Sequence, residues 1–162
     1  MISVDEFKNN HVLGNLSDAM LEKIIPLTDV LAFRSREYVF KHGESADHFY
    51  MLKRGKVLIE QRVSPFVTVS VGSLAPGESF GWDAVSGEAV YKLDSICVEA
   101  SEVYTVNRDA FLALMEKDLE LGFRMMRLGV SVLKKRLDHR TDQFVRALHT
   151  HPEIHELSEL PE

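Results

Sequence analysis

The sequence predicts a mainly β protein with helices at both ends, built as a sandwich or a barrel. Between positions 31 and 106, short β-favouring runs recur at regular spacing and are separated by Gly, Pro and Ser, as in two-layer β folds. Apolar stripes of helical period precede and follow this region. With 162 residues, 45% of them hydrophobic, the chain suits one domain with a substantial core.

Residues 1–30 are expected to be helical. Ser17 can cap a helix that ends near Ile25, where Pro26 follows. The expected β region is 31–106, and its predicted strands are Tyr38 to Phe40, His48 to Leu52, Lys56 to Val63, Phe66 to Leu74, Leu93 to Val98 and Glu102 to Val106.

Residues 107–148 are expected to form two more helices. Asn107 is a candidate N-cap for a helix over 108–117, and Asp118 for a long helix to about Leu148. Gly122 and Gly129 lie inside that helix, where glycine lowers helix stability relative to alanine. Either a close approach of another helix or a bend requires them, or the helix tolerates the loss of stability. Apolar residues follow alternating steps of three and four along it, and these are Leu119, Phe123, Met126, Val130, Leu133, Leu137, Phe144 and Ala147.

This seam has two interpretations. It is typical of a helix pair, which predicts a parallel homodimer through Met126, Val130, Leu133, Leu137 and Phe144. Alternatively, the stripe packs on the β region. We expect the first half of the stripe to do so at least in part.

The end of the chain, 149–162, is predicted to be a flexible acidic tail. His149, His151 and His155 form a loose cluster there, but a solvated tail gives them no rigid scaffold, and no metal site is assigned.

Composition excludes several classes of function. The formal net charge of −6 argues against a general nucleic-acid binder, which needs a basic face. The first residues have no leader pattern and no window is long enough to span a bilayer, so a cytoplasmic protein without a membrane partner is expected. Cys97 lies in an apolar run and is predicted to be a packed thiol.

One segment, Gly77 to Val85, can present backbone amides to an anion. Gly77 and Gly81 bracket the aromatic residue Phe80, and glycine allows positive φ and close approach to a ligand. Free amides ahead of a helical turn favour a phosphate or carboxylate. Two further stretches lie before it in the sequence, Leu16-Ser17-Asp18 and 40–57 (Phe-Lys-His-Gly-Glu-Ser-Ala-Asp-His-Phe-Tyr-Met-Leu-Lys-Arg-Gly-Lys-Val).

Together with Leu74 to Gly81, these stretches resemble the cyclic nucleotide-binding domain of catabolite-activator-type regulators, over about residues 15–148. The resemblance implies a double-sheet jelly roll (a double-stranded β-helix) with N-terminal helices and a long dimerisation helix, as one domain over 1–148. Relatives that bind DNA carry a helix-turn-helix domain after that helix, for which the 149–162 tail is too short, so no DNA binding is expected.

The chain departs from the family pattern where the ligand would be held. The family motif ends Phe-Gly-Glu, and its glutamate binds the ribose. In this chain Trp82 occupies the position of that glutamate, and the chain is most similar to a variant Phe-Gly-Trp subgroup. The family's phosphate-binding arginine is absent, and Lys92 is the nearest substitute. Losing a charge-assisted bond costs about 1.5–3 kcal/mol. The candidate ligand-binding residues are Gly77, Glu78, Ser79, Phe80, Gly81, Trp82, Asp83, Lys92 and Ser95.

The expected function is a stand-alone sensor that binds a small anion or a divergent nucleotide in the 77–95 segment and signals through its dimer to a separate effector protein. In that scheme Trp82 stacks on a ligand ring; alternatively it fills an empty pocket. The second hypothesis is a ligand-free dimeric scaffold, and a remote one is a metal-dependent cupin enzyme, although His42 and His48 lack the cupin spacing. No catalytic residue is nominated.

Overall fold

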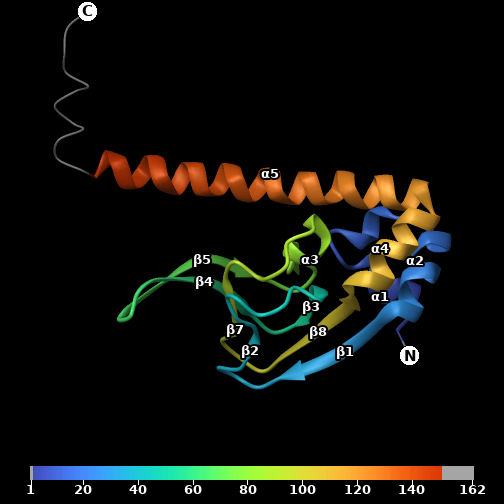
Figure 1. Cartoon of the computed structure of the whole chain (residues 1–162), viewed down its shortest axis with the longest axis horizontal. Coiled ribbons are helices and arrows are strands. Elements are labelled where there is room, and N and C mark those ends of the chain that lie inside the picture. The colour runs from blue at the N-terminus through green and yellow to red at the C-terminus, as the bar shows by residue number, and fades with distance from the viewer. Residues whose placement is uncertain (1, 151–162) are drawn as a thin grey trace, which may run out of the picture. The chain divides into compact units, whose positions relative to one another are not determined.

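Two four-stranded antiparallel sheets form the β region of the computed structural model, which describes residues 2–150 (Figure 1). Their strand orders are β1-β8-β3-β6 and β2-β7-β4-β5. This arrangement confirms the predicted jelly roll. The strands are β1 Thr28–Phe33, β2 Tyr38–Phe40, β3 His48–Arg54, β4 Val57–Ser64, β5 Val67–Leu74, β6 Ser79–Phe80, β7 Asp94–Cys97 and β8 Ser101–Asn107.

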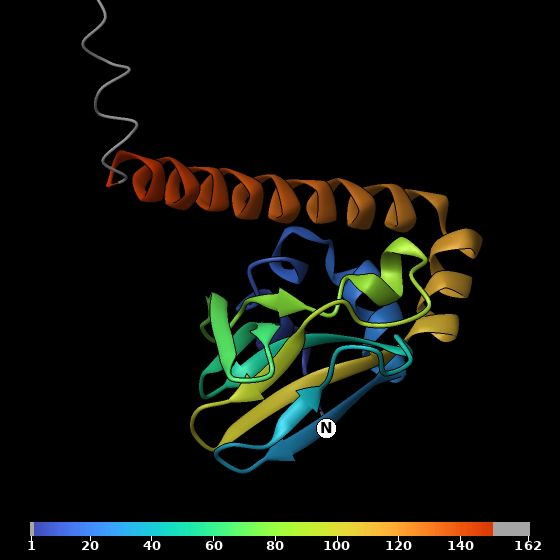
Figure 2. The same ribbon diagram turned by 60° about the vertical axis from the view of Figure 1, so that its left-hand side comes forward.

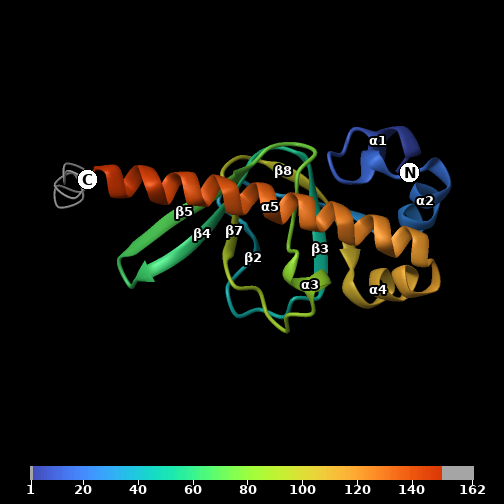
Figure 3. The same ribbon diagram turned by 90° about the horizontal axis from the view of Figure 1, so that it is seen from above.

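The chain divides into two compact units, Met1–Arg127 and Leu128–Glu162. In the first unit, helices α1 (Val4–Lys8), α2 (Asp18–Ile24) and α4 (Arg108–Lys117) gather at one end of the sheets, opposite the β4–β5 hairpin (Figure 3). The short helix α3 (Asp83–Ser86) lies beside α4 (Figure 2).

Strand β1 corrects the predicted boundary between helices and sheet. It begins at Thr28, inside the segment predicted to be helical, and pairs with β8 along its whole length, from Thr28 opposite Val106 to Phe33 opposite Ser101. Pairing with a distant strand is a tertiary contact, and it fixes these residues despite their weak local signal. Strand β6 was missed because a strand of only two residues gives no alternating pattern in the sequence.

The core lies between the two sheets. Cys97 is fully buried in it, as the packed-thiol prediction requires, and burial raises the pKa of its thiol. The buried side chains of this interior cluster are Phe40, Ala46, Tyr50, Leu52, Val57, Leu74, Phe80, Ala84, Tyr91, Cys97 and Val103.

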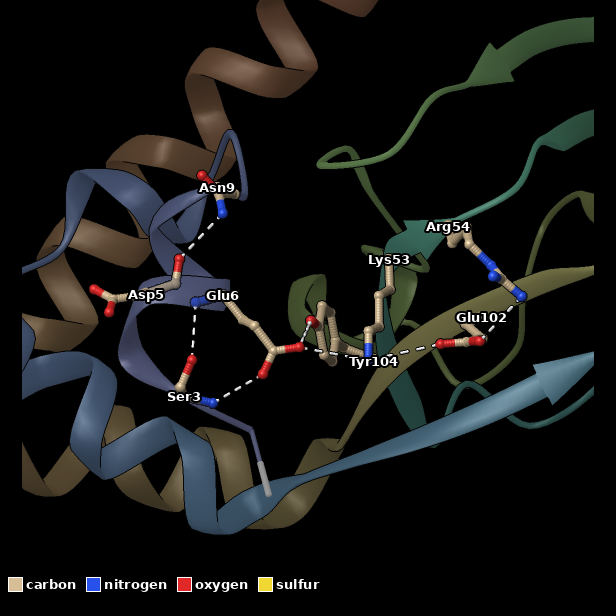
Figure 4. Close-up of polar contacts among 8 residues, drawn as sticks. All are labelled: Ser3, Asp5, Glu6, Asn9, Lys53, Arg54, Glu102 and Tyr104. Atoms are coloured by element: carbon tan, nitrogen blue, oxygen red, sulfur yellow. Dashed lines mark hydrogen bonds and ion pairs between the residues drawn. The ribbon is translucent and has the colours of Figure 1, made fainter.

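Helix α1 lies within the segment 1–30 that was expected to be helical, and Glu6 fixes its position through two sets of contacts. Ser3 and Glu6 form a reciprocal capping box at its start. The Glu6 carboxylate also accepts from the Tyr104 hydroxyl (3.3 Å) and pairs with Lys53 (3.5 Å), which joins α1 to β8 and β3 (Figure 4). Burial and the nearby Glu6 charge raise the pKa of Tyr104 to about 12, so its hydroxyl remains a donor.

The helix starts predicted downstream are confirmed. The Asn107 side chain accepts from the backbone amides of Asp109 and Ala110 at the start of α4. Asp118 accepts from the Leu121 amide at the start of α5 (Leu119–His149). The cap at Ser17 is positioned as predicted before α2, but its hydroxyl makes no cap bond.

Helix α5 presents the predicted apolar seam to solvent. In the first unit, Leu121 and Met125 are fully buried, whereas Leu119 and Phe123 are 76% and 62% exposed. The expectation that the first half of the seam packs on the β region is therefore wrong, because the buried residues there belong to a neighbouring stripe of the helix. Gly122 has a packing reason, because a Cβ there would lie 2.6 Å from the Met115 carbonyl oxygen.

The helix runs to His149, one residue past the predicted domain end, and the rest of the predicted tail, with His151 and His155, lies outside the described residues. Within residues 2–150 no helix is both long and apolar enough to cross a membrane. Over the same range no cluster of three His, Cys, Asp or Glu side chains is arranged to hold a metal ion.

Candidate ligand-binding cassette

The segment predicted to bind an anion, hereafter the cassette (residues 77–95), begins with a glycine that the fold itself requires. Gly77 has φ +92°, and a Cβ there would lie 3.1 Å from the His11 ring. Its amide donates to the Leu52 carbonyl (2.8 Å), and its carbonyl accepts from the His11 amide (2.9 Å). Gly77 therefore joins β3 to the N-terminal helices.

Gly81 also has a structural reason. Its φ is +70°, and a Cβ there would lie 2.9 Å from Cδ2 of Tyr50 and 3.1 Å from the His48 carbonyl oxygen. Close approach to a ligand was the reason that the sequence suggested for both glycines. Close packing against β3 accounts for Gly81, and contacts with the N-terminal segment account for Gly77, so their presence alone does not identify a ligand site.

The backbone between β6 and α3 does have the character of an anion site. Within residues 2–150, the backbone amides of Gly81 and Trp82 donate to no acceptor, while both carbonyls accept bonds from the first turn of α3. Adjacent amides with one residue at positive φ form a concave nest that suits an anionic oxygen.

The first side chains of the cassette serve its own structure. The Glu78 carboxylate accepts from the Ala75 amide (2.7 Å) and closes the turn before β6. The Ser79 hydroxyl is buried and accepts from the Trp82 indole nitrogen (3.0 Å). Neither side chain is directed to a ligand in this arrangement.

Trp82 fits neither of the two roles considered for it. Its indole is 8% exposed and meets the Phe49 ring edge-on, with ring centroids 4.8 Å apart, and Phe49 stacks on Phe111 of α4. Phe49 is absent from the interior cluster that contains its strand neighbour Tyr50, because side chains alternate along a strand. Trp82 therefore packs between sheet and helix, where it neither stacks in the roll nor fills it.

Aromatic rings occupy the interior of the roll next to the cassette. Phe40 and Tyr91 stack with centroids 3.9 Å apart and planes 15° apart, and Tyr50 and Phe80 stack at 5.3 Å. Burial raises the pKa of both tyrosines, so each keeps its proton. The Tyr91 hydroxyl donates to the His48 carbonyl (2.7 Å), which fixes the end of the cassette to β3.

Ser95 is the predicted site residue whose environment points most clearly to a ligand. It lies on β7 opposite Phe40 and Ile59, is fully buried, and its hydroxyl has no hydrogen-bond partner within the described residues. A buried hydroxyl without a partner is costly. A ligand oxygen would remove that cost.

The two charged candidates besides Glu78, which are Lys92 and Asp83, lie differently from expectation. Lys92 is exposed and pairs with the Glu88 carboxylate at 3.2 Å, which was not expected of a phosphate-binding residue. Asp83 is partly buried at the start of α3, and burial raises the pKa of its carboxyl. Its carboxylate would repel an anion nearby.

Arg108 is a residue that the sequence reasoning missed. Its guanidinium donates to the Glu88 carbonyl (2.9 Å), and its amide donates to the Asp47 carbonyl (2.8 Å). It therefore ties the loop after α3 to the first turn of α4. The position follows an N-cap in the sequence, but the contact spans 20 residues and has no local signal.

Comparison with known proteins identifies the family. Residues 30–118, more than half of the chain, match the family model described as the cyclic nucleotide-binding domain. The chain belongs to this family. A curated relative, the cGMP-dependent protein kinase isozyme 1 of Drosophila melanogaster, is 26% identical over 122 residues. That match covers 74% of this cyclic nucleotide-binding domain protein but 16% of the kinase.

Solved structures share the fold. A cyclic nucleotide-binding domain from Methylobacillus flagellatus has a TM-score of 0.79 and 14% identity, over 89% of this chain and 83% of that one. The regulatory domain of Toxoplasma gondii PKA, crystallised with cAMP, has a TM-score of 0.69 and 20% identity. The match covers 81% of this chain and 48% of that one. The sensor domain of the transcriptional regulator DNR from Pseudomonas aeruginosa has a TM-score of 0.66 and 19% identity. The match covers 82% of this chain and 94% of that one.

Proposed function

We propose that this protein is a non-catalytic sensor that binds a small anionic ligand or a divergent nucleotide in the cassette and signals through a homodimer. The observation that carries the proposal is the pair of adjacent amides at Gly81 and Trp82, which have no acceptor within residues 2–150. Family membership supports a nucleotide-like ligand, and the cAMP present in the Toxoplasma gondii structure supports it further.

The ligand is held by amides and a hydroxyl rather than by an ion pair. Lys92 pairs with Glu88, and Asp83 adds a negative charge one residue after Trp82 in the sequence. Arginine and glutamate partners for a cyclic nucleotide are absent from the matching positions. Cyclic AMP and cyclic GMP therefore bind weakly or not at all, with dissociation constants above the micromolar range, because each lost charge-assisted bond costs about 1.5–3 kcal/mol.

The signal leaves through the helices after β8. Arg108 connects the cassette loop to α4, and Asp118 connects the start of α5 to α2 through Lys23 (2.6 Å). The exposed seam of α5 supplies the dimer interface, since a stripe that is about half or more exposed would be covered by a second copy. Its members are Met126, Val130, Leu133, Leu137 and Phe144, at 49%, 65%, 48%, 62% and 63% exposure. A separate effector protein reads the dimer.

The proposal is tested by thermal melting of the purified protein with a library of anionic metabolites, followed by calorimetry on each hit. A ligand that binds only the folded state raises the transition by mass action. The Ser95→Ala variant should lose the effect, whereas Ser73→Ala, an exposed serine on β5, should keep it. A library without any hit would contradict the sensor.

The second candidate is a ligand-free dimeric scaffold. The stacked rings of Phe40, Tyr50, Phe80 and Tyr91 favour it, because these side chains themselves occupy the interior of the roll next to the cassette. A scaffold would be indifferent to every anion and would depend only on the α5 seam.

A further inference from the structure

A groove of about 630 Å³ lies apart from the cassette amides, on the first unit. The segments that line it are the end of β2 with the residues after it, the outer half of β4, and residues 92–94 before β7. These three segments are neighbours because β2, β7 and β4 are adjacent strands of one sheet (Figure 3). Its volume falls within the range of about 300–1,000 Å³ that is usual for small-molecule sites.

Strand register places this groove on the outer face of the sheet. Phe40 and Ile59 both pair with Ser95 and pack with the interior cluster. Glu60 pairs with Asp94, one residue further on each strand, so these two side chains point to the opposite face. A ligand that contacts Glu60 and Asp94 would therefore be separated from the interior of the roll by the sheet.

Basic side chains from all three segments line the groove. Lys41 and His42 follow β2, Arg62 lies on β4, and Lys92 precedes β7. Within residues 2–150, neither Lys41 nor Arg62 pairs with a carboxylate, and the Lys41 ammonium lies 4.7 Å from the Tyr38 ring centroid. Such a gathering is notable on a chain of net charge −6, and it suits a phosphate group.

The ion pair between Lys92 and Glu88 does not prevent a phosphate from binding to Lys92. Both side chains of that pair are at least half exposed, and an exposed pair of this kind contributes little. Its ammonium can exchange Glu88 for a phosphate oxygen at small cost.

The acidic residues restrict the kind of phosphate. Asp94 accepts from the His42 amide (2.7 Å), which fixes the segment after β2, and Glu60 lies across from Asp94 on the same face. Carboxylates repel a bare polyanion but accept hydrogen bonds from hydroxyl groups. We propose that this outer groove binds a hydroxylated organic phosphate, with its phosphate on Lys41, Arg62 and Lys92 and its hydroxyl groups on Glu60.

The test is an NMR titration of the ¹⁵N-labelled full chain with ribose 5-phosphate, with pyrophosphate and ribose as comparison probes. Ribose 5-phosphate should shift the amides of 38–42, 60–64 and 92–94 and leave Gly81 and Trp82 unchanged. Pyrophosphate should bind more weakly, and ribose should produce no shift. Lys41→Gln and Arg62→Gln should each weaken ribose 5-phosphate binding about tenfold or more.

One control variant and one further groove variant make the result decisive. Lys56→Gln removes an exposed cation outside the groove and should leave the affinity unchanged. Glu60→Gln should weaken ribose 5-phosphate and strengthen pyrophosphate. An unshifted groove at millimolar ribose 5-phosphate would overturn the proposal, as would an equal loss in Lys56→Gln or equal affinity for pyrophosphate. None of these outcomes bears on the proposed anion site at Gly81 and Trp82, whose amides are separate probes in the same spectra.

Discussion

The guanidinium of Arg108 donates a hydrogen bond to the backbone carbonyl oxygen of Glu88, 2.9 Å away. This contact joins the first residue of α4 to the loop after α3. It is a direct connection between the cassette and the helices that lead to the proposed dimer, so we expect a movement of the loop to reach α4.

Arg108→Gln should loosen that loop. We expect a loss of about 1–2 kcal/mol in the free energy of unfolding, because one charged hydrogen bond is removed, and faster hydrogen exchange at residues 87–90. Arg124→Gln is the matched control: its partner Glu120 lies on the same exposed helix surface, so the expected loss is within about 0.5 kcal/mol. Unchanged exchange in the loop of Arg108→Gln would exclude the coupling role.

Asp118 should give the protein a specific acid sensitivity. The hydrogen bond from Lys23 lowers the pKa of its carboxyl, and the Leu121 amide adds to the effect. A lowered folded-state pKa stabilises the fold above the unfolded pKa of about 3.9 and loses that contribution as the pH falls through the folded value.

Asp118→Asn keeps the helix cap but removes the charge. Its unfolding free energy should be lower than that of the unmodified protein at pH 7, and the gap should close below about pH 5. Denaturant titrations across this pH range measure it, and Lys23→Gln should reproduce the same pH dependence. A gap that stays constant into the acid range would assign the stabilisation to the cap alone.

Gly81 should tolerate substitution less well than Gly87. Both have positive φ, but a Cβ at Gly81 would lie 2.9 Å from Tyr50, whereas Gly87 faces open space. Gly87→Ala should lose about 1–2 kcal/mol from backbone strain alone, and Gly81→Ala should lose clearly more. Equal losses in chemical denaturation would mean that Tyr50 moves aside without cost.

The exposed seam of α5 should control the oligomeric state. Leu133→Glu combined with Leu137→Glu should convert a dimer to a monomer in light scattering at tens of micromolar, because charges replace apolar contacts at the interface. Ser131→Glu combined with His139→Glu adds two glutamates to the opposite side of the helix and should leave the dimer intact. A monomeric unmodified protein, or a dimer that survives the leucine substitutions, would contradict the interface.

Local chemistry in the sequence was sufficient for much of the fold. Strand runs such as Tyr38 to Phe40 and caps such as Asn107 and Asp118 occur where periodicity and side-chain preference placed them, since these signals lie within a few residues. Strand β1 was partly missed because its pairing with β8 is distant in sequence. The capping box of Ser3 and Glu6 was present in the sequence and could have predicted where α1 begins.

The cassette was found from the sequence, but the direction of its side chains was not. Trp82 and Phe80 are two residues apart, yet Phe80 joins the interior cluster and Trp82 packs on Phe49, because Gly81 turns the chain between them. Lys92 was chosen by position in the sequence, and its pairing with Glu88 depends on the loop geometry. Tyr91 was overlooked because its bond to His48 spans 43 residues.

The most direct measurement of the proposed function is the response of the Gly81 and Trp82 backbone amides in ¹⁵N NMR spectra. The probes are cyclic AMP, cyclic GMP, 5′-AMP and inorganic phosphate at millimolar concentrations. We expect at least one of these anions to shift both amides, with the cyclic nucleotides binding more weakly than micromolar, and the Ser95→Ala variant to reduce the affinity while remaining folded. If none of the four anions shifts either amide in the folded protein, the sensor proposal is contradicted and the ligand-free scaffold takes its place.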